Sequence, residues 1–311
     1  MEFLSQYGLF LLKSVTVVVA FLVLFAGIFS MSRKPKPKLE ITSLNEHYEH
    51  LHSAMNKEVL GIKPTKKKKE KIKQPSLFVI DFNGDIKASQ VDQLRDEITS
   101  ILSIAKPTDE ILLRLDSPGG SVNGYGLAAA QLQRIREKNI PLTVSIDKVA
   151  ASGGYLMACV ANTIIAAPFA IIGSIGVVAQ IPNFHRFLKK HNIDVEVLTA
   201  GEYKRTLTVF AENTDKGRQK FKEDLEKIHT AFRNYVLTNR SQLNIEKVST
   251  GEHWLASDAF ELRLVDKLVT SDEYLTDKMH DHKAFKVTIH AKTSMVNKLL
   301  KPTMRFMHPW A

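Results

Sequence analysis

Between residues 76 and 270 the chain alternates short apolar runs with longer segments of helical periodicity. The apolar runs are rich in leucine and β-branched residues and are bounded by Gly, Pro, Asn or Asp, which is typical of buried strands. We expect strands at residues 76–81, 111–115, 142–146, 163–166 and 195–199. Helices are predicted at residues 88–103, 123–138, 153–160, 183–190, 214–239 and 256–262. This order predicts an α/β domain over residues 76–270, with a parallel sheet covered by helices.

The N-terminal segment has another pattern, because residues 7–30 are apolar on every face and Lys13 is their only charge. About 20 such residues are enough to cross a bilayer. A cleaved signal peptide is the alternative, but no convincing small-x-small cleavage site follows. We therefore expect residues 1–32 to form one transmembrane helix, an uncleaved anchor that makes the lipid bilayer a partner.

A basic linker is predicted at residues 33–75. Residues 33–73 hold twelve Lys/Arg and five Glu, which is +7 of the net charge of +10 of the whole chain. The positive charges directly after the apolar segment favour a cytoplasmic position for the large domain. We interpret the lysine run as a solvated tether. Nucleic acid is not expected as a partner, because no aromatic residues interleave with these lysines. The histidines of this segment, His47, His50 and His52, have a spacing that suggests a metal, but we expect them to face solvent.

The C-terminal residues 271–311 form a predicted extension whose role the sequence does not indicate. Within it, residues 285–289 alternate like a strand, and residues 304–310 could touch a membrane or a neighbouring subunit.

The candidate chemistry begins at Ser152, which is flanked by small residues that leave its hydroxyl accessible. A serine becomes a good nucleophile when a neighbouring base takes its proton, and a lysine with a lowered pKa can be that base. Lys204 is one of 43 Lys+Arg residues, so the sequence alone does not establish the pair. A Ser-His-Asp triad is an alternative. The residues available for it are His185, His191, His253, Asp116 and Asp147.

Four motifs, at residues 115–120, 151–155, 173–177 and 201–205, occur in an order and spacing that resemble the signal peptide peptidase A family. The resemblance covers residues 75–270 and implies a ClpP/crotonase-like spiral of β-β-α units. It also implies a serine endopeptidase of the bacterial inner membrane that acts on peptide or protein substrates. One departure from the family pattern is Arg263, where relatives commonly have a glycine, and it puts a helix cap in doubt.

The same resemblance implies the roles of the site residues. Ser152 would be the nucleophile and Lys204 the general base, the N–H groups of Gly120 and Gly153 would form the oxyanion hole, and Ser174 would orient the lysine. No metal or other cofactor is implied. Family members with one copy of the motifs form homo-oligomeric rings, in which the lysine of one subunit completes the serine of the next. A non-proteolytic crotonase-like acyl-CoA enzyme and a membrane scaffold that binds anionic partners through its basic linker are the alternatives.

Overall fold

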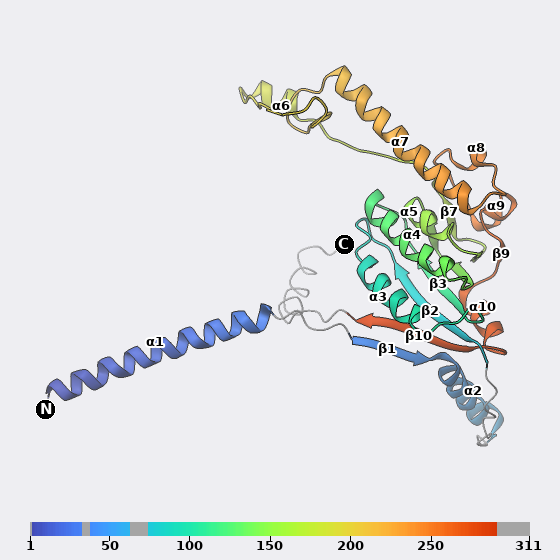
Figure 1. The fold of residues 1–311 in the computed structure, drawn as a ribbon, viewed down its shortest axis with the longest axis horizontal. Helices are drawn as coiled ribbons and strands as arrows, with labels where there is room; N and C mark the ends of the chain where they lie inside the picture. Colours follow the sequence, from blue (N-terminus) through green and yellow to red (C-terminus); the bar gives the residue numbers. More distant parts are fainter. Residues whose placement is uncertain (1, 33–37, 63–73, 291–311) are drawn as a thin grey trace. The chain divides into compact units, whose positions relative to one another are not determined.

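The computed structural model describes residues 2–32, 38–62 and 74–290 (Figure 1). It divides into two compact units, of which one contains Ile41–Thr288 and the other contains the chain before and after that range. Residues 304–310, for which the sequence suggests a membrane or subunit contact or a mobile end, lie outside the described residues.

The N-terminal segment forms helix α1 (Glu2–Ser32). Among the helices of the described residues, none combines the length and the apolar character needed to cross a membrane. The transmembrane helix predicted for residues 1–32 is therefore not confirmed.

The larger unit is built on a seven-stranded sheet with the order β1-β10-β2-β3-β4-β6-β9. From β10 to β9 all neighbouring strands run parallel. The strands are β1 (Lys38–Ser43), β2 (Ser76–Asn83), β3 (Glu110–Asp116), β4 (Leu142–Ile146), β6 (Thr163–Ala166), β9 (Lys267–Leu268) and β10 (Lys283–His290). A second sheet has the order β5-β7-β8 and contains β5 (Val149–Ala151), β7 (Ile171–Gly173) and β8 (His253–Leu255).

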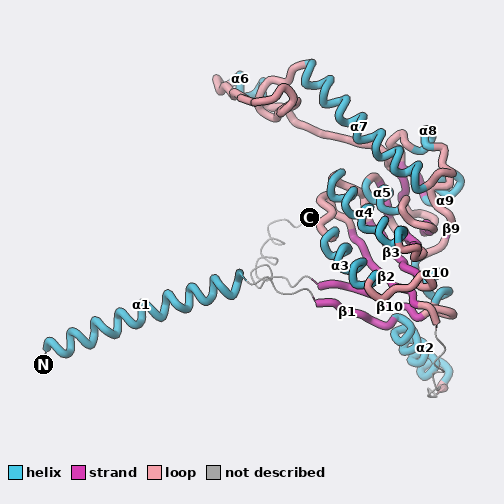
Figure 2. The backbone as a smooth tube through the Cα atoms, viewed as in Figure 1, coloured by secondary structure: helices cyan, strands magenta, loops and turns pink. Residues whose placement is uncertain are grey.

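Helices cover both faces of the large sheet (Figure 2). Ile80, Leu113 and Val144 lie side by side on one face and are fully buried. They belong to the main core, to which α3 (Val91–Leu102), α4 (Val122–Glu137) and α5 (Gly153–Ala158) contribute. A smaller core on the other face is formed with α2 (Leu44–Leu60) and α10 (Ser271–Lys278). The remaining helices are α6 (His185–Lys190), α7 (Asp215–Asn239), α8 (Ile245–Val248) and α9 (Ala256–Glu261).

The α/β class and the parallel sheet are confirmed. Four of the five strands predicted for the core and all six helices are present, with ends that differ by a few residues, and the strand-like alternation at residues 285–289 lies in β10. The strand predicted at residues 195–199 is wrong, because this segment is an exposed loop. Its alternating valines suggested a strand, but a strand also needs a partner for its backbone groups, and no ladder reaches this segment.

The turn after α9 explains the departure at Arg263. This residue has a φ of 61°, in the left-handed region that a side chain disfavours and glycine adopts readily. A glycine would remove this steric cost. The departure at Arg263 therefore affects the backbone conformation after α9, which ends at Glu261.

An ion pair crosses the second face of the large sheet. Asp81 on β2 accepts hydrogen bonds from Arg114 on β3, Nε to Oδ1 at 2.6 Å and Nη2 to Oδ2 at 3.0 Å. Lys286 on β10 lies 2.7 Å from Oδ2 of the same carboxylate. Burial alone would raise the pKa of Asp81, but the hydrogen bonds from Arg114 and Lys286 outweigh it and hold the pKa below its ordinary value of 3.8.

Replacing Asp81 with asparagine is expected to lower the free energy of unfolding by about 1–3 kcal/mol at neutral pH, because Arg114 and Lys286 lose a charged partner. Since the pKa of Asp81 is lowered on folding, its contribution to the free energy of unfolding is fully present above pH 3.8 and is lost as the pH falls through the pKa of the folded state. Urea unfolding of the wild type and of Asp81→Asn at pH 7 and pH 2 measures this difference in stability. Asp92→Asn, which removes an exposed partner of Arg95, is the control and should cost less than about 1 kcal/mol. A difference for Asp81→Asn that does not shrink in acid would contradict the assignment.

Candidate active site

Ser152 lies at the turn between β5 and α5 and has φ 53° and ψ −118°. A positive φ is uncommon for a residue with a side chain and is stored strain, which the surrounding structure must hold. Here the Ser152 N–H donates to the carbonyl of Gly173 at 2.8 Å, and Leu156 N–H donates to the Ser152 carbonyl at 3.0 Å. The turn holds the serine at the start of a helix, and its side chain lines an open cavity.

The predicted oxyanion donors, Gly120 and Gly153, both line that cavity with Ser152. Neither N–H has a hydrogen-bond acceptor within the described residues. Gly153 is also the first residue of α5, where helix N–H groups are free and the helix dipole is positive. Free N–H donors near a nucleophile are the groups from which an oxyanion hole is built.

The loop of Gly120 is packed tightly against the turn of Ser152. A Cβ atom placed on Gly119, which has a φ of 90°, would lie 2.7 Å from Ser152 Cβ and 2.7 Å from Gly153 N. A Cβ atom on Gly153 would lie 2.4 Å from the ring of Tyr125. Both glycines are therefore required by close approach, which explains why the two motifs are glycine-rich.

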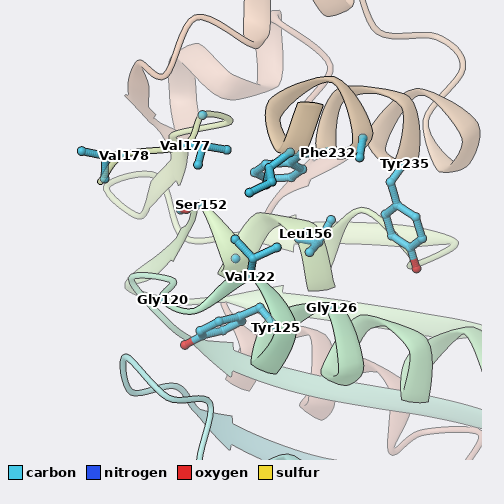
Figure 3. Close-up of a pocket in the computed structure, with 14 residues that line it drawn as sticks. Gly120, Val122, Tyr125, Gly126, Ser152, Leu156, Val177, Val178, Phe232 and Tyr235 are labelled. Atoms are coloured by element: carbon cyan, nitrogen blue, oxygen red, sulfur yellow. The ribbon is translucent and has the colours of Figure 1, made fainter. Parts of the chain in front are cut away.

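The cavity beside Ser152 has a volume of about 340 Å³ and largely apolar walls (Figure 3). Its lining comes from α4, α5, the segment after β7, and the C-terminal half of α7. The apolar side chains are those of Val122, Leu156, Val177, Val178, Ile228, Ala231 and Phe232, and Tyr125 and Tyr235 also belong to the lining. Sequence reasoning missed this wall. The spacing of Ile228, Phe232 and Tyr235 on one face of the predicted helix was the available signal.

Lys204 is exposed and does not line this cavity. Its neighbours contact the first turns of α7: Lys216 Nζ lies 2.5 Å from Glu202 Oε1, and Lys220 Nζ lies 5.5 Å from the centroid of the Tyr203 ring. The hydrogen bond from Lys216 lowers the pKa of Glu202. At 1.5 Å per helical residue, Lys216 lies about 18 Å and Lys220 about 12 Å along the α7 axis from Ile228, the first cavity residue on that helix. In one chain, Lys204 is thus not among the residues that line the cavity of Ser152.

Ser174 directly follows Gly173, whose carbonyl accepts the hydrogen bond from Ser152 N–H. Ser174 has a φ of 52°, and its N–H donates to the carbonyl of Glu252 at 2.6 Å. The backbone of Ser174 thus lies close to that of Ser152, but its proposed partner Lys204 is absent from this neighbourhood.

The alternative triad is not assembled in the described residues. None of its three histidines lines the cavity of Ser152. Asp116 pairs with Lys148 at 3.2 Å, and Asp147 accepts from the N–H and hydroxyl of Ser271 at the start of α10. Both carboxylates therefore have structural partners away from the serine.

Comparison with known proteins identifies the family of this chain. Residues 134–286 match peptidase family S49, and residues 2–132 match the peptidase family S49 N-terminal region. The chain is 49% identical to "Probable protease SohB" of Buchnera aphidicola subsp. Schlechtendalia chinensis, over 89% of this chain and 100% of that protein. It is 46% identical to "Probable protease SohB" of Haemophilus influenzae, over 96% of this chain and 92% of that protein.

Among solved structures, a mutant of the 1510-N membrane-bound stomatin-specific protease matches with a TM-score of 0.45 and 17% identity, over 67% of this chain and 86% of that chain. The sequence relatives carry the assignment, because two of them align over nearly their whole length. The chain therefore belongs to peptidase family S49 and resembles its SohB proteases, as the four motifs predicted.

Proposed function

We propose that this protease is a serine endopeptidase with a Ser152-Lys204 dyad. The observation that supports the proposal is the strained turn of Ser152 at an apolar cavity, whose lining also includes Gly120 and Gly153, with N–H groups that have no acceptor within the described residues. Labelling the purified protein with a fluorophosphonate probe and locating the modified residue by mass spectrometry tests it. Modification at Ser152 supports the proposal, and modification only elsewhere contradicts it.

In the proposed mechanism the uncharged amine of Lys204 takes the proton of Ser152 Oγ, and Oγ attacks the carbonyl carbon of the scissile peptide. The oxyanion of the tetrahedral intermediate accepts hydrogen bonds from Gly120 N–H and Gly153 N–H. The intermediate collapses, the C–N bond breaks, and Lys204 gives its proton to the leaving amine. Water then attacks the acyl-enzyme ester and releases the acid product and the free serine. Ser174 would orient the amine of Lys204.

Lys204 would come from a second copy of the chain. The segment of Lys204 contacts the start of α7, whereas the wall of the cavity begins at Ile228, about 12 to 18 Å further along the helix, which supports a dyad formed between subunits. A closed assembly with cyclic symmetry would repeat the same contact, so that each serine meets the lysine of a neighbour. We propose a homo-oligomeric ring on this ground.

The substrates would be unfolded or membrane-derived peptides with an apolar side chain at the cleavage site. The cavity beside Ser152 is bounded by aliphatic and aromatic side chains, and charged groups are absent from its lining. A charged substrate side chain would lose its hydration there without gaining a partner, whereas an apolar one gains by burial.

Narrowing the cavity is expected to change this preference. Gly126 on α4 lines the cavity, and a Cβ atom placed on it meets no atom within 4 Å. Gly126→Leu should therefore fold and occupy part of the cavity. We expect kcat/KM for a peptide with leucine or phenylalanine before the cleaved bond to fall about 10- to 100-fold relative to one with alanine. Fluorogenic peptides that differ at this one residue measure the ratio.

Gly126→Ala is the matched control. It should raise the free energy of unfolding by about 0.5–1 kcal/mol, because alanine is the better residue inside a helix, and leave the preference nearly unchanged. An unchanged preference in a folded Gly126→Leu chain would show that substrates do not use this cavity.

The attachment of this protease to a membrane stays a prediction from the sequence of residues 7–30, as does the spiral arrangement of β-β-α units. We propose a position at the bacterial inner membrane, with the catalytic domain on the cytoplasmic side as the positive charges after residue 32 favour. Extraction of the membrane fraction at alkaline pH tests the attachment, since a bilayer-spanning anchor resists it and a peripheral protein is released.

A further inference from the structure

We propose that Tyr125 and Ser117 are positioning residues for catalysis, which hold the oxyanion loop, residues 118–120, in the shape that presents Gly120 N–H beside Ser152. This inference rests on the proposed function, because it assigns a role within the same reaction. Neither residue would touch the reacting atoms. Both would act through the backbone of the loop.

Three hydrogen bonds link the loop to the interior. Gly119 N–H donates to Ser117 Oγ at 3.2 Å, Ser117 Oγ lies 2.6 Å from Tyr125 Oη, and Tyr125 Oη donates to the carbonyl of Asp85 at 2.9 Å. The donor and acceptor of each of these hydrogen bonds are fixed, because a carbonyl can only accept and each hydroxyl has one proton. Tyr125 gives its proton to Asp85, so Ser117 must give its proton to Tyr125. Each hydroxyl donates one hydrogen bond and accepts one, and hydrogen bonds linked in this way strengthen one another.

The network lies in a site with no spare space. Ser117 and Tyr125 are fully buried. A Cβ atom on Gly84 would lie 2.2 Å from Ser117 Oγ and 2.3 Å from Tyr125 Oη, so the loop after β2 closes over both hydroxyls. Burial raises the pKa of Tyr125, which keeps its hydroxyl a proton donor at neutral pH.

Ser117 also connects the loop to the nucleophile. Its N–H donates to the carbonyl of Val149 at 2.8 Å, and its carbonyl accepts from Ala151 N–H at 3.0 Å, so its backbone is fixed to the strand that leads to Ser152. Its side chain engages the N–H of Gly119. The next N–H along the chain, that of Gly120, is left free at the cavity. The network thus selects which N–H of the loop is available to an oxyanion.

The test compares Tyr125→Phe and Ser117→Ala with the wild type on one apolar peptide. Tyr125→Phe leaves Ser117 without an acceptor, and Ser117→Ala leaves Gly119 N–H without one. We expect kcat to fall about 10- to 100-fold, less than on complete loss of an oxyanion donor, while KM changes less than about 2-fold. A peptide aldehyde, whose adduct with Ser152 carries an oxyanion, should bind correspondingly more weakly. The matching peptide alcohol, which forms no adduct, should bind equally well.

Tyr155→Phe is the matched control. Tyr155 is also fully buried and donates to a backbone carbonyl, that of Leu264, at 3.0 Å, but it makes no hydrogen bond to the oxyanion loop. It should keep the kcat and the aldehyde affinity of the wild type. If Tyr155→Phe lost both as strongly as Tyr125→Phe, the effect would be one of general stability and the positioning role would be wrong.

Failure of this inference and failure of the proposed function give different results. If Ser152→Ala abolishes turnover but Tyr125→Phe and Ser117→Ala keep the wild-type kcat and aldehyde affinity, the positioning role is overturned and the serine mechanism stands. If turnover survives in Ser152→Ala, the proposed function is overturned and the positioning role with it. Loss of kcat in Ser117→Ala alone supports the role even where Tyr125→Phe does not fold, because Ser117→Ala leaves the Tyr125–Asp85 bond in place.

Discussion

A chain with Ser152→Ala is expected to lose its labelling by a fluorophosphonate probe and to lose kcat by a factor on the order of 10⁶, the size found when a serine protease loses its nucleophile. The reason is chemical, because alanine has no oxygen to attack the carbonyl, and the oxyanion donors alone provide only a small residual rate. Probe labelling and hydrolysis of an apolar fluorogenic peptide measure the two losses. Since the strained turn fits alanine no worse than serine, the variant should remain folded.

Ser257→Ala is the control for this result. Ser257 is an exposed serine on α9 and should keep both labelling and turnover when replaced. Equal labelling of wild type and Ser152→Ala would show that another residue is the nucleophile.

Lys204→Arg is expected to be as inactive as Lys204→Ala, although it keeps the positive charge. A general base must lose its proton, and the guanidinium group does not do so in the working pH range. The measurement is kcat for both variants on the same peptide. Lys189→Arg, an exposed lysine on α6, is the matched control and should be fully active. If the Lys204→Arg chain were active, Lys204 would contribute only its positive charge, and its role as general base would be contradicted.

The parts of this protein that could be predicted from sequence are those set by local pattern. β4 and β6 begin and end at the predicted residues, because both are short runs rich in aliphatic and β-branched side chains, which favour strands. The two glycine motifs were predicted to surround Ser152, and the structure explains them by close approach at Gly119 and Gly153. Arg263 is a similar case. The family pattern has a glycine at this position, and the structure shows the left-handed backbone conformation that glycine favours.

The parts that could not be predicted depend on distance in space. Residues 195–199 have the alternation of a strand, but pairing depends on a partner strand that no local pattern reveals. Sequence spacing does not say where Lys204 lies relative to Ser152. Its neighbours Glu202 and Tyr203 contact the first turns of α7, whereas the other half of that helix lines the cavity. The role of Ile228, Phe232 and Tyr235 could not be predicted either. Helical periodicity identifies the apolar face of α7 but not the cavity that this face lines.

The central claim is that Ser152 of one copy works with Lys204 of another. The most direct measurement is the peptidase activity of co-expressed Ser152→Ala and Lys204→Ala chains that carry different tags and are purified through both. Each variant alone should be inactive. In a random mixed assembly about a quarter of the sites combine an intact serine with an intact lysine, so we predict about a quarter of the wild-type activity. Doubly tagged assemblies with no activity would contradict the account, because the serine and the lysine would then have to come from the same chain.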